Sequence, residues 1–337
     1  MFSIKTRLKS NRFVRNKILP KCRAIRGQGQ WIKKSLKPLY WRIPMALNRG
    51  VMSVELQATG VGLFATLTQV LYLLVYCDRH KIIPHVRLSG SHYINPEIGP
   101  DWFDYYFENT AFSSTNNLRR RPRYTHYVDN LDELGIGGYF LPTFTDLGTT
   151  ITDAHKIFFR YVQIKADILA AVDTFSATYF HERHVLGVHY RGTDKHSEAP
   201  RVSWESFHQA LSDYLASHPE VNAIFVASDE CSFIEKVKLH FSDIEVVTHE
   251  DNYRSDDGLA IHSASIKGDN YKKGRDAIIN SLLLSKCSAL MRTTSALSGW
   301  ASILNPEIPV VLLNRPYDHT SWFPETEVLK VASVWPA

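Results

Sequence analysis

The sequence predicts an α/β protein whose carboxyl-terminal half forms a doubly wound, parallel β-sheet. Short apolar runs of strand length recur through that half, and each run is too short to be a helix. Segments with apolar residues at helical spacing separate the runs, and such alternation is typical of parallel sheets covered by helices. The length of 337 residues exceeds what one hydrophobic core usually supports, so we expect two domains.

Charge is divided unevenly along the chain, although the net value is only +5. Residues 1–50 contain 14 of the 39 basic side chains and no acidic one, so the remainder is acidic overall. We expect residues 1–48 to form a basic amphipathic extension. Cations mixed with large apolar side chains suit a helix lying on an anionic membrane surface, and a solvated extension is the alternative. Nucleic acid ranks last as a partner, because the rest of the chain is acidic.

The chain lacks the usual features of a secreted or membrane-spanning protein. The amino terminus has no apolar signal-peptide core, and the longest apolar run, residues 61–76, includes Thr66, Thr68 and Gln69. We therefore expect a buried helix there and a cytoplasmic protein, with peripheral attachment to the inner membrane surface as an option. The cysteines have no paired spacing that indicates disulfides or a zinc site, so free and mostly buried thiols are expected at Cys22, Cys77, Cys231 and Cys287.

The first half begins with one βαβ unit. Residues 52–57 alternate as a strand does, the run 63–76 is predicted to be a helix, and residues 82–86 form the second strand. Between the first strand and the helix lie Gly60 and Gly62. They are either simple turn residues or positions that let helix N-terminal amides approach a phosphate.

The middle of the chain is less regular. Residues 90–150 are rich in aromatic residues, proline and glycine, and no element can be placed there; irregular stretches of this kind often shape a binding site. Apolar residues at helical spacing then predict one long helix over residues 153–180, which links the two halves.

Polar side chains gather where the strands of the second half end. The predicted strands are residues 185–190, 223–227, 244–247, 289–291 and 310–313. The helices are one capped by Ser203, one carrying Phe233 and Val237, one over residues 274–286 and one after Ser295. The strand-end side chains are His189, Arg191, Asp194 and Lys195 after the first strand, Ser228 and Asp229 after the second, and Arg292, Thr293, Thr294 and Ser295 after the fourth.

These groups are expected to converge on one crevice, because parallel strands share a carboxyl edge. Arginine, lysine, hydroxyls and a helix N-terminus together suit the diphosphate of a nucleotide. No Walker pattern and no cluster of metal-ligand residues appears, so neither a P-loop site nor a metal is indicated. Structural roles are the alternatives: an internal pair of Arg191 with Asp194, a core histidine at His189, a solvated loop acid at Glu198, and helix N-caps at Asp229 and Ser295.

The central motif also resembles a known family. His189-x-Arg191-Gly192-Thr193-Asp194-Lys195, followed by Ser197-Glu198-Ala199, is similar to the motif of α1,6-fucosyltransferases. These include the enzyme that core-fucosylates N-glycans and the rhizobial nodulation enzymes; protein O-fucosyltransferases are more distantly similar. The likeness extends to residues 224–230, 280–285 and 290–295 and to the turn at Gly60 and Gly62. It covers about residues 50–80 and 183–315.

The resemblance implies a GT-B-like fold of two Rossmann-like lobes with doubly wound parallel sheets. Residues 49–180 would form the acceptor-side lobe and residues 181–337 the nucleotide-sugar lobe. It implies an inverting, metal-independent transfer of fucose from GDP-fucose to a glycan or lipid-linked oligosaccharide. No cofactor is implied. Another nucleotide sugar, or a non-catalytic sugar- or nucleotide-binding protein of the same fold, remains the alternative.

The resemblance also assigns roles. Arg191 would hold the β-phosphate and stabilise the leaving GDP, Lys195 would add a second cation, and Glu198 would be the general base. The donor pocket would be formed by His189, Asp194, Asp229, Thr293, Ser295, Gly60 and Gly62. Members of the family often have a second arginine where this chain has Gly192, and Arg201, Arg292 or a backbone amide could supply that donor. The acid expected to contact guanine is replaced by Asn280 or displaced to Asp276.

Overall fold

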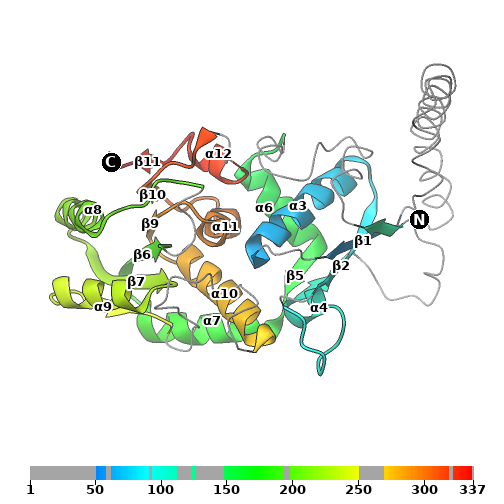
Figure 1. Ribbon diagram of the computed structural model, residues 1–337, viewed down its shortest axis with the longest axis horizontal. Helices are drawn as coiled ribbons and strands as arrows, with labels where there is room; N and C mark the ends of the chain where they lie inside the picture. Colours follow the sequence, from blue (N-terminus) through cyan, green and yellow to red (C-terminus); the bar gives the residue numbers. More distant parts are fainter. Residues whose placement is uncertain are drawn as a thin grey trace, which may run out of the picture.

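The structure is a computed structural model that describes residues 51–57, 62–90, 93–111, 123–125, 148–192, 198–249, 269–318 and 322–335. Within these residues the chain forms a three-stranded sheet, a six-stranded sheet and one two-stranded pair. Figure 1 shows the small sheet and the large sheet on opposite sides of the molecule. The predicted extension 1–48 and three predicted site residues, Gly60, Asp194 and Lys195, lie outside the described residues.

The predicted βαβ unit is confirmed. Strand β1 (Val51–Gln57) pairs in parallel with β2 (Ile83–Ser89), and α3 (Leu63–Arg79) connects them. The short strand β4 (Arg123–Thr125), within the stretch left unassigned from the sequence, pairs with the other edge of β1. Thirteen of the 17 side chains of α3 are buried, which explains why its sequence is apolar on nearly every face. No helix in the described ranges is long and apolar enough to cross a membrane.

The prediction of one long helix over residues 153–180 is wrong. The segment forms α6 (Ile151–Tyr161) and α7 (Ala166–Tyr179), separated by the strand β5 (Val162–Ile164). Strand β5 pairs antiparallel with β3 (Phe107–Asn109), which directly follows the short helix α4 (Phe103–Tyr106). In β5 the two β-branched side chains are buried and Gln163 between them is exposed, so the alternation of a strand interrupts the helical pattern for only three residues.

The predicted doubly wound sheet is confirmed in the second half. All its strand pairings are parallel, in the order β11-β10-β9-β6-β7-β8. Its strands are β6 (His184–Tyr190), β7 (Val221–Ser228), β8 (Glu245–Val247), β9 (Ala289–Arg292), β10 (Val310–Leu312) and β11 (Ser333–Val334). The sequence analysis ended the sheet at residue 313 and therefore missed β11, which has only two residues and too little pattern to predict.

Helices cover both faces of this sheet. One face packs against α8 (Trp204–Ser217) and α9 (Cys231–His240), and the other faces α7, α10 (Asn270–Ser285) and α11 (Ala296–Leu304). The short helix α12 (Glu325–Val328) follows. The hydroxyl of Ser203 accepts a hydrogen bond from the Ser206 amide, as predicted for a cap. Helix α10 begins four residues earlier than predicted, because Asp269 caps it and Gly274 lies inside it.

The two halves share one hydrophobic core. The indole N–H of Trp300 in α11 donates to the hydroxyl of Thr68 in α3 at 2.9 Å, and both side chains are buried. The Tyr106 hydroxyl donates to the Tyr271 carbonyl at 2.9 Å. That approach requires glycine at position 274, since a Cβ there would lie 2.6 Å from Cζ of Tyr106. The boundary expected at residue 180 falls between α7 and β6 and stays a prediction.

Candidate active site

The ends of three neighbouring strands meet, as the parallel arrangement predicts. Strand β6 lies between β7 and β9, so the residues that follow all three are adjacent. The Thr293 amide donates to the His189 carbonyl at 3.0 Å, and the Thr293 hydroxyl accepts from the Arg191 amide at 3.0 Å. On the other side, the Gly192 amide donates to Oδ1 of Asp229 at 3.4 Å. The carboxyl edge of β6 is therefore held from both sides.

Arg191 places a cation where the two halves of the molecule meet. Its Nε lies 3.7 Å from Oδ2 of Asp229, and the side chains are 18% and 10% exposed. Its charge also acts on Tyr93, whose hydroxyl accepts from the Leu63 amide at 2.8 Å. Burial raises the pKa of Tyr93 to about 12, against the opposing effects of that amide and of Arg191. The guanidinium of Arg191 is thus electrostatically coupled to the beginning of α3.

His189 is a neutral, buried imidazole beside this cation. Burial lowers its pKa to about 3, and the charges of Arg191 and Arg292 add to the effect. Its Nδ1 is buried and has no hydrogen-bond partner among the described residues. A neutral imidazole nitrogen left in this state is able to donate to or accept from a ligand, according to its tautomer.

Ser295 directly precedes α11, and its hydroxyl is left unused by the helix. The residue occupies the N-cap position, and its side chain makes no capping hydrogen bond. Its hydroxyl is fully buried and lacks a partner within the described ranges. Ser295 therefore holds the predicted N-cap position, but its side chain does not make the capping hydrogen bond. Buried hydroxyls are normally paired, so this group is a second one near the crevice that a ligand could satisfy.

Asp229 is not a helix cap. The N-cap position of α9 belongs to Glu230, whose side chain makes no capping bond. The Asp229 carboxylate turns instead towards Arg191 and the Gly192 amide. The prediction that Asp229 lines the crevice fits this placement, and the alternative of a plain cap is wrong. The adjacent Glu230 points to the other side and lies 3.6 Å from Arg201.

Arg292 directs its two terminal nitrogens at a buried carboxylate, while its Nε is buried without a partner in the described part of the chain. Its two terminal nitrogens lie 2.7 Å and 2.6 Å from the carboxylate oxygens of Glu325, and both side chains are 0% exposed. Its charge is therefore already balanced by Glu325, which makes it a weak substitute for the second arginine that the family often has at the position of Gly192. Arg201 has a side chain that is 65% exposed and remains accessible.

Glu198 and Gly62, two further predicted site residues, are described through their backbones. The carbonyl of Glu198 accepts from the Tyr317 amide at 2.9 Å, which fixes its backbone near the carboxyl edge of the sheet. Gly62 is the N-cap of α3, with φ −67 and ψ 163, a conformation open to any residue. The described residues contain no group of three or more His, Cys, Asp or Glu side chains able to hold a metal ion.

Tyr93 and Glu230 were missed in the sequence analysis as site residues, and Asp276 was noted only as an alternative. Tyr93 lies in the stretch where no element was predicted, and Glu230 was hidden by its neighbour Asp229. Asp276 lies in α10 and is 4% exposed; Oδ2 accepts from Lys272 at 2.8 Å, and Oδ1 is buried without a partner in the described part of the chain. Burial raises the pKa of this carboxyl.

Two Rossmann-like α/β units, with polar groups gathered at the carboxyl edge of the second sheet, define the GT-B class of fold. A solved NodZ α-1,6-fucosyltransferase, co-crystallised with GDP, superposes with a TM-score of 0.50 at 17% sequence identity. The match covers 79% of this chain and 96% of that one, and it shows the shared fold. A mutant of Arabidopsis thaliana FUT1 in complex with GDP gives a TM-score of 0.46 at 12% identity, covering 81% of this chain and 73% of that one.

The chain belongs to the Nodulation protein Z (NodZ) family. The model of that family matches residues 147–319, just over half of the chain. Nodulation protein Z of Bradyrhizobium diazoefficiens is 24% identical over 177 residues, which cover 49% of this chain and 46% of the relative. The chain thus aligns with about half the length of this curated relative.

Proposed function

We propose that this protein transfers fucose from GDP-fucose to a hydroxyl group of a glycan acceptor. Membership of the NodZ family supports the reaction, and the related α-1,6-fucosyltransferase co-crystallised with GDP supports the donor. The observation that carries the proposal is the position of Arg191. It is a partly buried guanidinium, set by Thr293 and Asp229 at the meeting point of three strand ends and close to the amino-terminal lobe.

Arg191 would bind the β-phosphate of the donor. A guanidinium offers two parallel N–H donors to phosphate oxygens and keeps its charge at all working pH values. As the bond between fucose and phosphate breaks, negative charge grows on the leaving GDP. A preorganised cation at that point stabilises the transition state more than the ground state, and its loss typically costs about 10²–10³ in rate. Lys195 would add a second cation.

The nucleoside would be held by groups that the protein leaves unsatisfied. Nδ1 of His189, the hydroxyl of Ser295 and Oδ1 of Asp276 are buried and have no partner among the described residues. Bound nucleotide would complete their hydrogen bonds, with the Asp276 carboxylate accepting from N–H groups of the base. Asp194 and the turn at Gly60 and Gly62 would complete the donor pocket.

The chemical step would be a single displacement. Glu198 would take the proton of the acceptor hydroxyl as its oxygen attacks the anomeric carbon of fucose, and GDP would leave with the bonding electron pair. Attack opposite the leaving group inverts that carbon. The positive charge of Arg191 and Lys195 would do the work that a metal ion does in other transferases, so we expect the reaction to proceed without one.

A thermal-shift screen against GDP, UDP, ADP and CMP, with and without EDTA, tests the donor assignment. A ligand at about 100 times its dissociation constant adds about 2.7 kcal/mol of stability. We expect GDP-selective stabilisation that survives EDTA and is lost in Arg191→Ala. The matched control is Arg183→Ala. Arg183 pairs with Glu245 and directly precedes the first residue of β6, whereas Arg191 follows its last residue. Stabilisation by UDP instead would change the donor, and no response to any nucleotide would overturn the proposal.

A further inference from the structure

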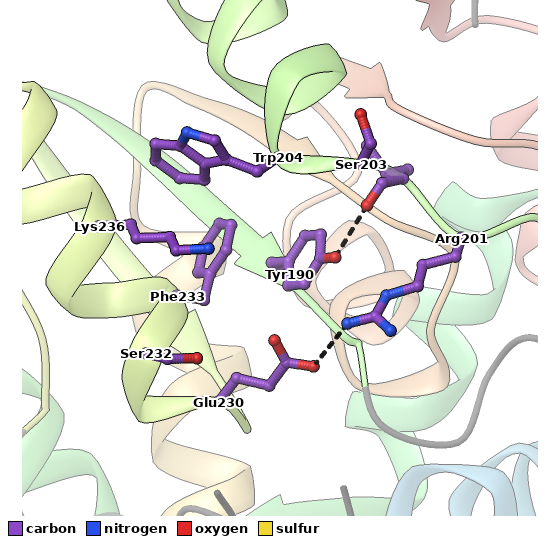
Figure 2. A pocket seen from close by; sticks show the side chains of 9 residues that line it. Tyr190, Arg201, Ser203, Trp204, Glu230, Ser232, Phe233 and Lys236 are labelled. Carbon is purple, nitrogen blue, oxygen red and sulfur yellow. Dashed lines mark hydrogen bonds and ion pairs between the residues drawn. The ribbon is translucent and has the colours of Figure 1, made fainter.

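A pocket of about 460 Å³ opens between the beginnings of α8 and α9 (Figure 2). Its volume is in the range of small-molecule sites. It lies across β6 from the imidazole of His189, because successive side chains of a strand point to opposite faces. Tyr190 belongs to the core cluster under α8 and α9. The lining residues are Tyr190, Arg201, Val202, Ser203, Trp204, Glu230, Ser232, Phe233 and Lys236.

One part of the lining is aromatic and rigid. The rings of Tyr190 and Phe233 are stacked, with centroids 4.1 Å apart and planes 7° apart. Trp204 meets Phe233 edge-on at 6.1 Å and is half-buried. The Tyr190 hydroxyl is used internally, since it donates to the Val202 carbonyl at 2.8 Å. These rings provide an apolar surface against which the C–H groups of a sugar ring could pack.

The rest of the lining is polar and carries both charges. Glu230 and Arg201 lie 3.6 Å apart across the pocket, with side chains 19% and 65% exposed, and Figure 2 shows the two turned towards each other. The ammonium of Lys236 lies 5.7 Å from the Trp204 ring centroid. A carboxylate that accepts beside cations that donate can bind neighbouring hydroxyl groups. The carboxylate suits hydroxyl groups that donate to it, and the aromatic rings suit C–H groups, so the lining matches a neutral sugar.

The pocket and the Arg191 site lie on two sides of the carboxyl end of β6. Asp229 faces Arg191, and the next residue, Glu230, faces the pocket. Gly192 separates the two sites, and a Cβ there would lie 2.6 Å from Cδ of Glu230, so a side chain at this position would push the Glu230 carboxylate out of its place. Consecutive Cα atoms are only about 3.8 Å apart. A sugar bound in the pocket would therefore hold its hydroxyl groups near the donor.

We propose that the pocket between α8 and α9 binds a neutral sugar residue of the acceptor glycan, with Trp204 packing on the ring and Glu230 and Arg201 bonding its hydroxyls. This assignment rests on the proposed transferase function. It names the face from which the acceptor approaches: the side of the carboxyl-terminal sheet that α8 and α9 cover.

Direct binding tests the assignment on the full chain. Calorimetric titrations with GDP, and with neutral tetrasaccharides of glucose, N-acetylglucosamine or mannose, would compare wild type with Trp204→Leu and Glu230→Gln. The matched control is Glu235→Gln, which removes an exposed carboxylate from the same helix. We expect at least one tetrasaccharide to bind, both pocket variants to weaken it at least tenfold, and the control to leave it unchanged. The affinity for GDP should stay within twofold in all four proteins, which also shows that the variants are folded.

The two proposals fail in different ways. Tetrasaccharide binding that is unchanged in both pocket variants, or absent in wild type, would overturn the pocket assignment while GDP binding still supports the transferase. Absence of GDP binding would overturn the donor assignment, and the tetrasaccharide titrations would then decide whether the pocket binds sugars by itself.

Discussion

Glu325→Gln should destabilise this protein far more than the loss of a surface carboxylate. Glu325 and Arg292 are both 0% exposed and joined by two short hydrogen bonds. The substitution keeps the shape and leaves the guanidinium buried without its counter-charge. Breaking a buried pair from one side costs about 3–5 kcal/mol. With a urea slope of about 3 kcal/mol per molar, the unfolding midpoint should fall by about 1–1.7 M.

Urea unfolding followed by both circular dichroism and fluorescence measures this shift. The matched control is Glu327→Gln in the same short helix, whose partner Lys330 is 65% exposed; a surface pair contributes about 0–1 kcal/mol. Replacing both buried partners, as Arg292→Met with Glu325→Leu, should recover most of the loss, because no unpaired charge remains. Equal midpoints for Glu325→Gln and Glu327→Gln would refute the reasoning.

Three further changes test the packing around the site. His189 binds its proton only near pH 3 when folded, so stability should fall by about 1.4 kcal/mol per unit as pH drops from about 6.5, where the unfolded histidine titrates. His189→Asn should remove that slope from midpoints measured between pH 4 and 6; an unchanged slope would contradict a neutral imidazole. Thr68→Val leaves the buried indole N–H of Trp300 unpaired and should cost about 1–3 kcal/mol in urea unfolding; an unchanged midpoint would contradict a stabilising role for this hydrogen bond. Gly274→Ala forces a methyl group against the Tyr106 ring and should cost about 1–3 kcal/mol; an unchanged melting temperature would show that the ring moves aside.

The local pattern of apolar and polar residues was sufficient to predict most of the helices and strands. Strand-length apolar runs and helical spacing located β6, β7 and the helices that follow them, because their periodicity is a property of adjacent residues. The pattern failed where pairing with a distant segment decided the outcome. Residues 162–164 form a strand because Phe107–Asn109 lies beside them, and nothing in their own neighbourhood breaks the helical spacing strongly enough to show it.

By itself the sequence determined that a cation and hydroxyls gather at one edge of a parallel sheet, since parallel topology brings all carboxyl ends together. Only the tertiary structure decided what each group does there. Arg292 is paired with Glu325, 33 residues further along the chain, whereas Arg191 remains at the junction of the two lobes. Asp229 faces one site and Glu230 the other. The direction of a charged side chain depends on partners that are distant in sequence, and the spacing of neighbouring residues does not reveal those partners.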